Sequence, residues 1–261
     1  MNRVKIRYNL DFIPVSSIAE QWYCEKALDL QYQHPNVVFK LPGLDFGTVG
    51  HELIAQEAEP ITKEELKEYI KDGRALRLHE TMFEGLYGNI LIRGIPDYIE
   101  IKDGKANFLV EFKFSKKKRI FKNHRIQLDT YGYLLYKNKI DIKNLFCGIA
   151  IFPLNELNQD EAINEVIKKM KRWLSTLRNK RLDKLFFNEP RSFGGYLYPF
   201  SLSEAKSNLK WAMNYWLKKR EPIPTKKANK CKACPYNVAG FCKIALTEAD
   251  KHRIKIKKKR K

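Results

Sequence analysis

The stretch that decides the fold is "FLVEFKF", residues 108–114, because its side chains divide between two faces. Successive side chains of a β-strand point to opposite faces, so the four alternate apolar residues share one face while Glu111 and Lys113 share the other. A strand with one face in water often carries such a pair. Whether Glu111 and Lys113 belong to a functional site therefore has to be judged from the preceding segment.

That preceding segment, "GIPDYIEI" (94–101), reads as a second strand joined to the first by a turn around "KDGK" (102–105). A two-residue turn would place Asp97 opposite Val110, on the apolar face. A turn with an extra residue or a bulge would place Asp97 opposite Glu111. Facing carboxylates repel unless a cation lies between them, so the second register predicts a metal site.

The overall composition indicates a globular, strongly basic protein. The 261 residues include 50 Lys and Arg against 30 Asp and Glu, which gives a formal net charge of +20. This excess favours a nucleic-acid partner, the alternative being a basic surface kept for solubility. Since we find no apolar run of about 18 residues and no signal-peptide core in the opening "MNRVKIRYNL", we expect a cytoplasmic protein with no membrane partner.

The chemistry expected around Glu111 is that of a hard divalent cation. Carboxylates from Asp97 and Glu111 suit Mg²⁺ or Mn²⁺, and Lys113 could orient water or neutralise a phosphate. The pattern Pro96-Asp97 followed by Glu111-x-Lys113 resembles the restriction-endonuclease-like superfamily of PD-(D/E)XK phosphodiesterases. This resemblance implies an α/β core in which helices flank a mixed sheet.

Three further features accompany this pattern. His51, on an expected short helix, resembles the extra metal ligand of the RecB-like branch. In "QLDTYGYLLY" (127–136), Gln127 and Tyr131 lie one helical turn apart and resemble its Q-x-x-x-Y motif. The basic and aromatic stretch at 113–125 is typical of a surface that binds a phosphate backbone and stacks bases.

The five cysteines indicate metal chemistry more than disulfides. Cys231, Cys234 and Cys242 form a tight trio, and Cys24 lies far away in an expected N-terminal helix. Their spacing leaves zinc and an iron-sulfur cluster both open. Cys147 lies in the apolar run 145–152, where we expect it to be a core residue.

The order of these motifs from residue 24 to residue 242 resembles the CRISPR-associated RecB-like exonuclease family. That resemblance implies a 4Fe-4S cluster on the four cysteines, Mg²⁺ or Mn²⁺, and degradation of single-stranded DNA from the 5′ end alongside the CRISPR integrase. Two departures are Glu25, where relatives often have proline, and the seven residues between Cys234 and Cys242.

We accordingly expect the metal ligands to be His51, Asp97, Glu111 and the carbonyl oxygen of Phe112. Lys113 would act on the attacking water and the scissile phosphate. Two catalytic residues from the expected helix, Gln127 and Tyr131, would organise the site or contact DNA.

The alternatives are a recombination or repair nuclease of a virus or mobile element and a non-catalytic DNA-binding iron-sulfur adaptor. The sequence leaves open whether the DNA substrate contains duplex junctions and whether the chain forms a homo-oligomer. We expect three regions: an N-terminal helical region (1–60), the nuclease core with flanking helices (61–220), and an iron-sulfur module with a basic tail (221–261). The local patterns predict helices at 17–32, 63–72, 125–138, 159–187 and 202–219, a meander of strands at 75–114, a buried strand at 145–152, and a loop at 188–199.

Overall fold

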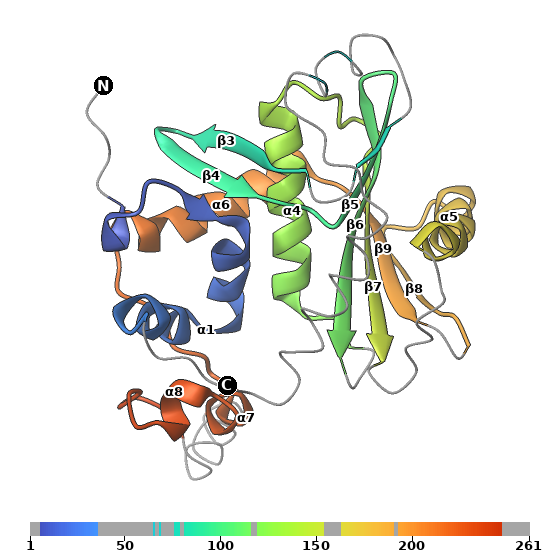
Figure 1. Ribbon diagram of the computed structural model, residues 1–261. Coiled ribbons are helices and arrows are strands. Elements are labelled where there is room, and N and C mark those ends of the chain that lie inside the picture. The colour runs from blue at the N-terminus through green and yellow to red at the C-terminus, as the bar shows by residue number, and fades with distance from the viewer. Residues whose placement is uncertain are drawn as a thin grey trace, which may run out of the picture.

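The computed structural model shows strands flanked by helices, and it describes residues 6–35, 65, 68, 76–78, 81–115, 119–153, 163–190 and 193–246 (Figure 1). The described helices are α1 (Val15–Gln33), α4 (Lys122–Lys137), α5 (Ile163–Asn179), α6 (Leu202–Trp216), α7 (Ala228–Lys232) and α8 (Pro235–Val238), with a 3₁₀ turn at Arg7–Asn9. His51 lies outside the described residues. Of the helix expected at 63–72, only residues 65 and 68 are described, and both are helical. In the described part of the chain, no helix is long and apolar enough to cross a membrane.

The main sheet is mixed, as the family resemblance implies. Its described strands lie in the order β2-β5-β6-β7-β9-β8, and within this sheet β6 and β7 pair in parallel while the other neighbours pair antiparallel. A smaller sheet has the order β1-β4-β3. The strand bounds are β1 Ile13–Pro14, β2 Leu76–Leu78, β3 Phe83–Tyr87, β4 Ile90–Gly94, β5 Tyr98–Lys102, β6 Lys105–Ser115, β7 Phe146–Pro153, β8 Leu185–Asn188 and β9 Gly194–Pro199.

Helix α4 connects β6 to β7 and lies on one face of the main sheet, whereas α5 lies on the other (Figure 1). Each face has its own buried apolar cluster. On β6, Leu109 packs toward α4, and Phe108, Val110 and Phe112 pack toward α5. The alternation expected from "FLVEFKF" is therefore present, and it points Glu111 and Lys113 toward α4.

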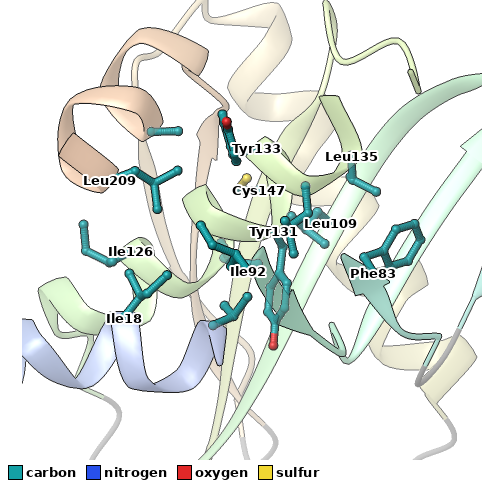
Figure 2. Close-up of a cluster of buried hydrophobic side chains, with 14 of the residues drawn as sticks. Ile18, Phe83, Ile92, Leu109, Ile126, Tyr131, Tyr133, Leu135, Cys147 and Leu209 are labelled. Atoms are coloured by element: carbon teal, nitrogen blue, oxygen red, sulfur yellow. The ribbon is translucent and has the colours of Figure 1, made fainter. Parts of the chain in front are cut away.

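The α4 side of the core is drawn in Figure 2, where Tyr131 and Cys147 lie among side chains from several elements. Cys147 is fully buried, which confirms the prediction that it is a core residue. Burial and the neighbouring Asp129 raise the pKa of the Cys147 thiol. It takes no part in the group of cysteines near the chain's C-terminal end.

The hairpin between β5 and β6 resolves the question of register. Lys102 pairs with Lys105 across a two-residue turn, in which Asp103 and Gly104 both have positive φ (52° and 69°). The turn itself therefore carries no extra residue. The extra residue lies further along β6, where Asn107 is passed over between the pairs Ile101–Ala106 and Glu100–Phe108.

Two expectations for the region after β7 are wrong. The helix expected at 159–187 ends at Asn179 in α5, and residues 185–188 form β8 instead. The expected loop at 188–199 contains β9, which pairs with both β7 and β8. At Gly195 an added Cβ would lie 2.3 Å from the ring of Phe187, so this glycine marks close packing within a strand.

The N-terminal helix and the C-terminal segment lie side by side (Figure 1). Helix α1 is interrupted at Cys24, whose backbone is extended (φ −169°, ψ 108°). Next to it, Glu25 is fully buried and accepts hydrogen bonds from Arg220 Nη2 (2.6 Å) and the Ile223 amide (2.8 Å). The segment that leads to α7 and α8 is thereby fixed beside Cys24.

Candidate active site

The first component of the candidate site is a pair of carboxylates from adjacent strands. Tyr98 pairs with Val110, so the next position of the ladder places Asp97 across from Glu111. Asp97 Oδ2 accepts a hydrogen bond of 2.7 Å from the Phe112 amide. The bulge at Asn107 makes this possible, because without it Asp97 would lie one position away and face the α5 core.

Glu111 is the most deeply buried charged group of the site, with 1% of its surface exposed. Its Oε1 atom accepts a bond of 2.6 Å from Lys113 Nζ. Its Oε2 atom is buried and has no hydrogen-bond partner among the described residues. Burying a carboxylate oxygen without a hydrogen-bond partner costs free energy. A bound cation, or a proton donated by a ligand, would remove that cost.

Lys113 connects the strands to α4. Besides Glu111, its Nζ atom donates a hydrogen bond of 3.1 Å to Gln127 Oε1. Burial lowers the pKa of Lys113, but the carboxylates of Glu111 and Asp97 raise it by more, so the net shift is upward. Lys113 therefore carries its positive charge at neutral pH.

Tyr131 lies one turn beyond Gln127 on α4 and is 4% exposed. Its hydroxyl donates a hydrogen bond of 2.8 Å to the Ile95 carbonyl, two residues before Asp97. Burial and the charge of Glu111 raise its pKa, so it remains a hydroxyl donor. Tyr131 thus fixes the approach of the chain to Asp97, and Figure 2 shows its hydroxyl at the edge of the apolar cluster.

Two residues near Lys113 were not predicted from the sequence. The carboxylate of Glu20 on α1 contributes to the raised pKa of Lys113. His124, on the first turn of α4, has a pKa lowered to about 4 by burial and by the charge of Lys113. The spacing of His124 and Gln127, three residues apart on one helix, is a signal that could have identified His124.

The residues present fit a hard cation in type and in placement. Asp97 and Glu111 supply carboxylate oxygens, and magnesium sites in proteins often have only one or two such ligands. No group of three or more His, Cys, Asp or Glu side chains in the described ranges is arranged to hold a metal ion. His51, the further ligand expected from the sequence, lies outside those ranges.

Four of the cysteines line one small cavity, which we call the cysteine cavity: Cys24, Cys231, Cys234 and Cys242. All five cysteines of the described chain are free thiols. Burial, together with the other three thiols of the cavity, raises the pKa of Cys242. The Thr225 amide lies 3.4 Å from Cys24 Sγ. Thiols are the residue type that zinc and iron-sulfur clusters prefer, but these four described cysteines are not arranged to hold a metal ion in this structure.

The comparison with protein families identifies the superfamily of this chain. Residues 45–239 match the family model of the PD-(D/E)XK nuclease superfamily. The chain belongs to this superfamily, whose members are generally nucleases that use Mg²⁺ or Mn²⁺.

Among curated proteins, no match was found. A solved structure described as "Crystal structure of SSO0001" is similar, with 14% sequence identity and a TM-score of 0.49, over 91% of this chain and 88% of that chain.

Proposed function

We propose that this nuclease is a metal-dependent DNA exonuclease that hydrolyses single-stranded DNA from the 5′ end. The observation that carries the proposal is the buried Glu111, beside Asp97 and Lys113 at the centre of the sheet, whose Oε2 atom has no hydrogen-bond partner among the described residues. A buried carboxylate pair with an ammonium group is costly as a structural device, and it suits phosphodiester hydrolysis.

Asp97, Glu111, the Phe112 carbonyl and His51 would hold the metal, which supplies Lewis-acid stabilisation of phosphoryl charge and an acidified water. Lys113 would act as a cation. Because its pKa is raised, it is protonated when substrate arrives, which favours neutralisation of the scissile phosphate over removal of a proton from water. Gln127 would hold Lys113 in place through its 3.1 Å hydrogen bond.

The finer parts of the proposal depend on the order of motifs along the chain. The cysteine cavity would hold a 4Fe-4S cluster, and residues 221–261 would form a module fixed by that cluster to the N-terminal region (1–60), beside the nuclease core (61–220). The resemblance described above supports a role in CRISPR spacer acquisition, in the cytoplasm and alongside the CRISPR integrase.

The test is cleavage of single-stranded DNA labelled at the 5′ or the 3′ end, in Mn²⁺, Mg²⁺ or EDTA. We expect metal-dependent shortening from the 5′ end by the wild-type chain. Removing the Lys113 ammonium in Lys113→Met should slow cleavage by about 10²- to 10⁴-fold, and Glu111→Gln should reduce it at least as much.

The matched control is Glu165→Gln on α5, whose carboxylate is exposed and bonded to Lys168. This variant should cleave like the wild type. Circular dichroism and thermal unfolding should show that all three variants are folded. Wild-type cleavage rates in Glu111→Gln and Lys113→Met would overturn the assignment, and DNA binding without cleavage in any metal would favour a non-catalytic adaptor.

A further inference from the structure

A concave surface lies on the other side of α4 from Lys113. It is a groove of about 570 Å³, which we call the α4–β8 groove, lined by residues of α4, β8, β9 and α6. On α4, His124 and Gln127 face Lys113, whereas Lys122, Arg125 and Asp129 line the groove. The first turns of this helix therefore contact both surfaces.

The groove combines positive charge with an exposed aromatic ring. Phe186 on β8 is 64% exposed and packs on Tyr196 with ring centroids 4.6 Å apart. Lys122 and Lys184 are exposed at the edges of the groove. The Arg125 guanidinium lies 4.7 Å from the centroid of the Tyr198 ring.

The two carboxylates in the groove are engaged by neighbours. Asp129 accepts a hydrogen bond of 3.0 Å from Tyr198, and Glu204 accepts one of 3.3 Å from Arg125. Arg119 adds a further cation beside the groove, 5.4 Å from the ring of Phe121. No acidic residue lies in the first turn of α4, and the described residues provide no side-chain cap for its amides. The surface is therefore suited to an anion.

The register of the sheet relates this groove to Glu111. Glu111 pairs with Ile149, Ile149 with Tyr196, and Tyr196 with Phe186, so these four side chains lie in one row on the same face. Three strand spacings separate Glu111 from Phe186, which is about 14 Å. A polymer held at Phe186 is thus a few nucleotides from Glu111.

We propose that the α4–β8 groove binds an unpaired segment of the DNA strand next to the site of cleavage, with a base stacked on Phe186 and phosphates paired with Lys122, Arg125 and Lys184. This inference rests on the proposed nuclease function, since it assigns the groove to the same substrate. Stacking on an exposed ring tolerates every base, so the groove would select single strands over duplexes without reading their sequence.

The test is the dissociation constant for a fluorescent single-stranded oligonucleotide and for a duplex, measured by anisotropy in EDTA with the full chain. We expect Phe186→Ala to raise the dissociation constant for the single-stranded oligonucleotide about fivefold or more, with little effect on the dissociation constant for the duplex. Lys184→Gln should lower the slope of log affinity against log salt by about 0.7.

Two controls match these variants outside the groove. Leu86→Ala on β3 removes a side chain that is 48% exposed, and Lys143→Gln removes an exposed lysine before β7. Both should bind single strands like the wild type. The proposal would be overturned if Phe186→Ala leaves the dissociation constant for single strands unchanged, or if it weakens duplex binding equally. It would also be overturned if the groove variants instead lose binding to a protein.

The two proposals fail separately. If Phe186→Ala weakens single-strand binding but no metal supports cleavage by the wild type, the groove stands and the nuclease function is wrong. If the wild type cleaves DNA and Phe186→Ala binds it normally, the groove is wrong and the nuclease function stands.

Discussion

The carboxylate site (Asp97, Glu111, Lys113 and Gln127) and the cysteine cavity are held in place by different means. Glu111 and Lys113 project from an eleven-residue strand that pairs with a neighbour on each side and is packed by apolar clusters on both faces. By contrast, three of the thiols lie on or next to α7 and α8, which have five and four residues. Helices this short are not stable by themselves.

This difference indicates what each region requires. The carboxylate site is fixed by the sheet before any ligand arrives, so removal of the proposed metal should cost activity and leave the fold intact. The cysteine cavity depends on a few contacts between distant segments, so removal of the proposed cluster should disorder the module. Of the next three changes, the first two test this contrast and the third concerns the α4–β8 groove; they run from the largest expected effect to the smallest.

The largest effect is expected from Cys231→Ala, because the proposed cluster would lose one of its four thiol ligands. Anaerobically purified wild type should contain iron and absorb visible light, and the variant should lose both. Limited proteolysis should then cut the variant between residues 221 and 246, while the nuclease core remains intact.

Cys147→Ala is the matched control, since this buried cysteine lies in the core and away from the cavity. It should retain the iron of the wild type. A colourless, zinc-loaded wild-type protein would contradict the iron-sulfur proposal, and an undigested module in Cys231→Ala would contradict the contrast drawn above.

A smaller effect is expected from Glu25→Gln. Glu25 is fully buried and bonded to Arg220, Gln21 and the Ile223 amide, so the substitution removes one charge of a buried ion pair. We expect a loss of about 3 kcal/mol in the free energy of unfolding, measured with denaturant. Glu221→Gln, with its side chain 92% exposed, should cost almost nothing, and equal stabilities for the two variants would refute this role of Glu25.

The smallest effect concerns the core side of the α4–β8 groove. Burial raises the pKa of Asp129 to about 6, despite the Tyr198 hydrogen bond and the charges of Arg125 and Lys122, with Glu204 adding to the rise. Because the folded state binds this proton more tightly than the unfolded state, stability falls as pH rises from about 4 through about 6.

Between pH 4.5 and pH 7, the wild type should lose about 2 kcal/mol relative to Asp129→Asn, which has no such proton. Denaturant titrations of both proteins at several pH values measure this difference. A constant difference between the two proteins across that pH range would show that Asp129 does not titrate as we expect.

The sequence predicted the two faces of β6 and the need for a bulge, because alternation is a local property. It did not locate the bulge at Asn107. The Asp103-Gly104 turn takes only two residues, both with positive φ, so the extra residue that places Asp97 beside Glu111 lies in the strand, where no local sequence signal marks it. Strands β8 and β9 were missed because their pairing partners lie elsewhere in the chain.

Long-range polar contacts were equally hidden. Glu25 was noted only as a departure from relatives, whereas its partner Arg220 lies 195 residues away. The α4–β8 groove gathers residues from 120 to 208, so no local pattern indicated it. Cys24 and the C-terminal trio were placed together from their residue type, and the structure lines one cavity with all four.

The most direct test of the central claim, that Asp97 and Glu111 form a preorganised carboxylate site for a divalent cation, is Mn²⁺ binding to the full chain measured by electron paramagnetic resonance. We expect the wild type to bind Mn²⁺, the Asp97→Asn and Glu111→Gln double variant to lose this binding, and Cys231→Ala to retain it. Wild-type affinity in the folded double variant would contradict the claim.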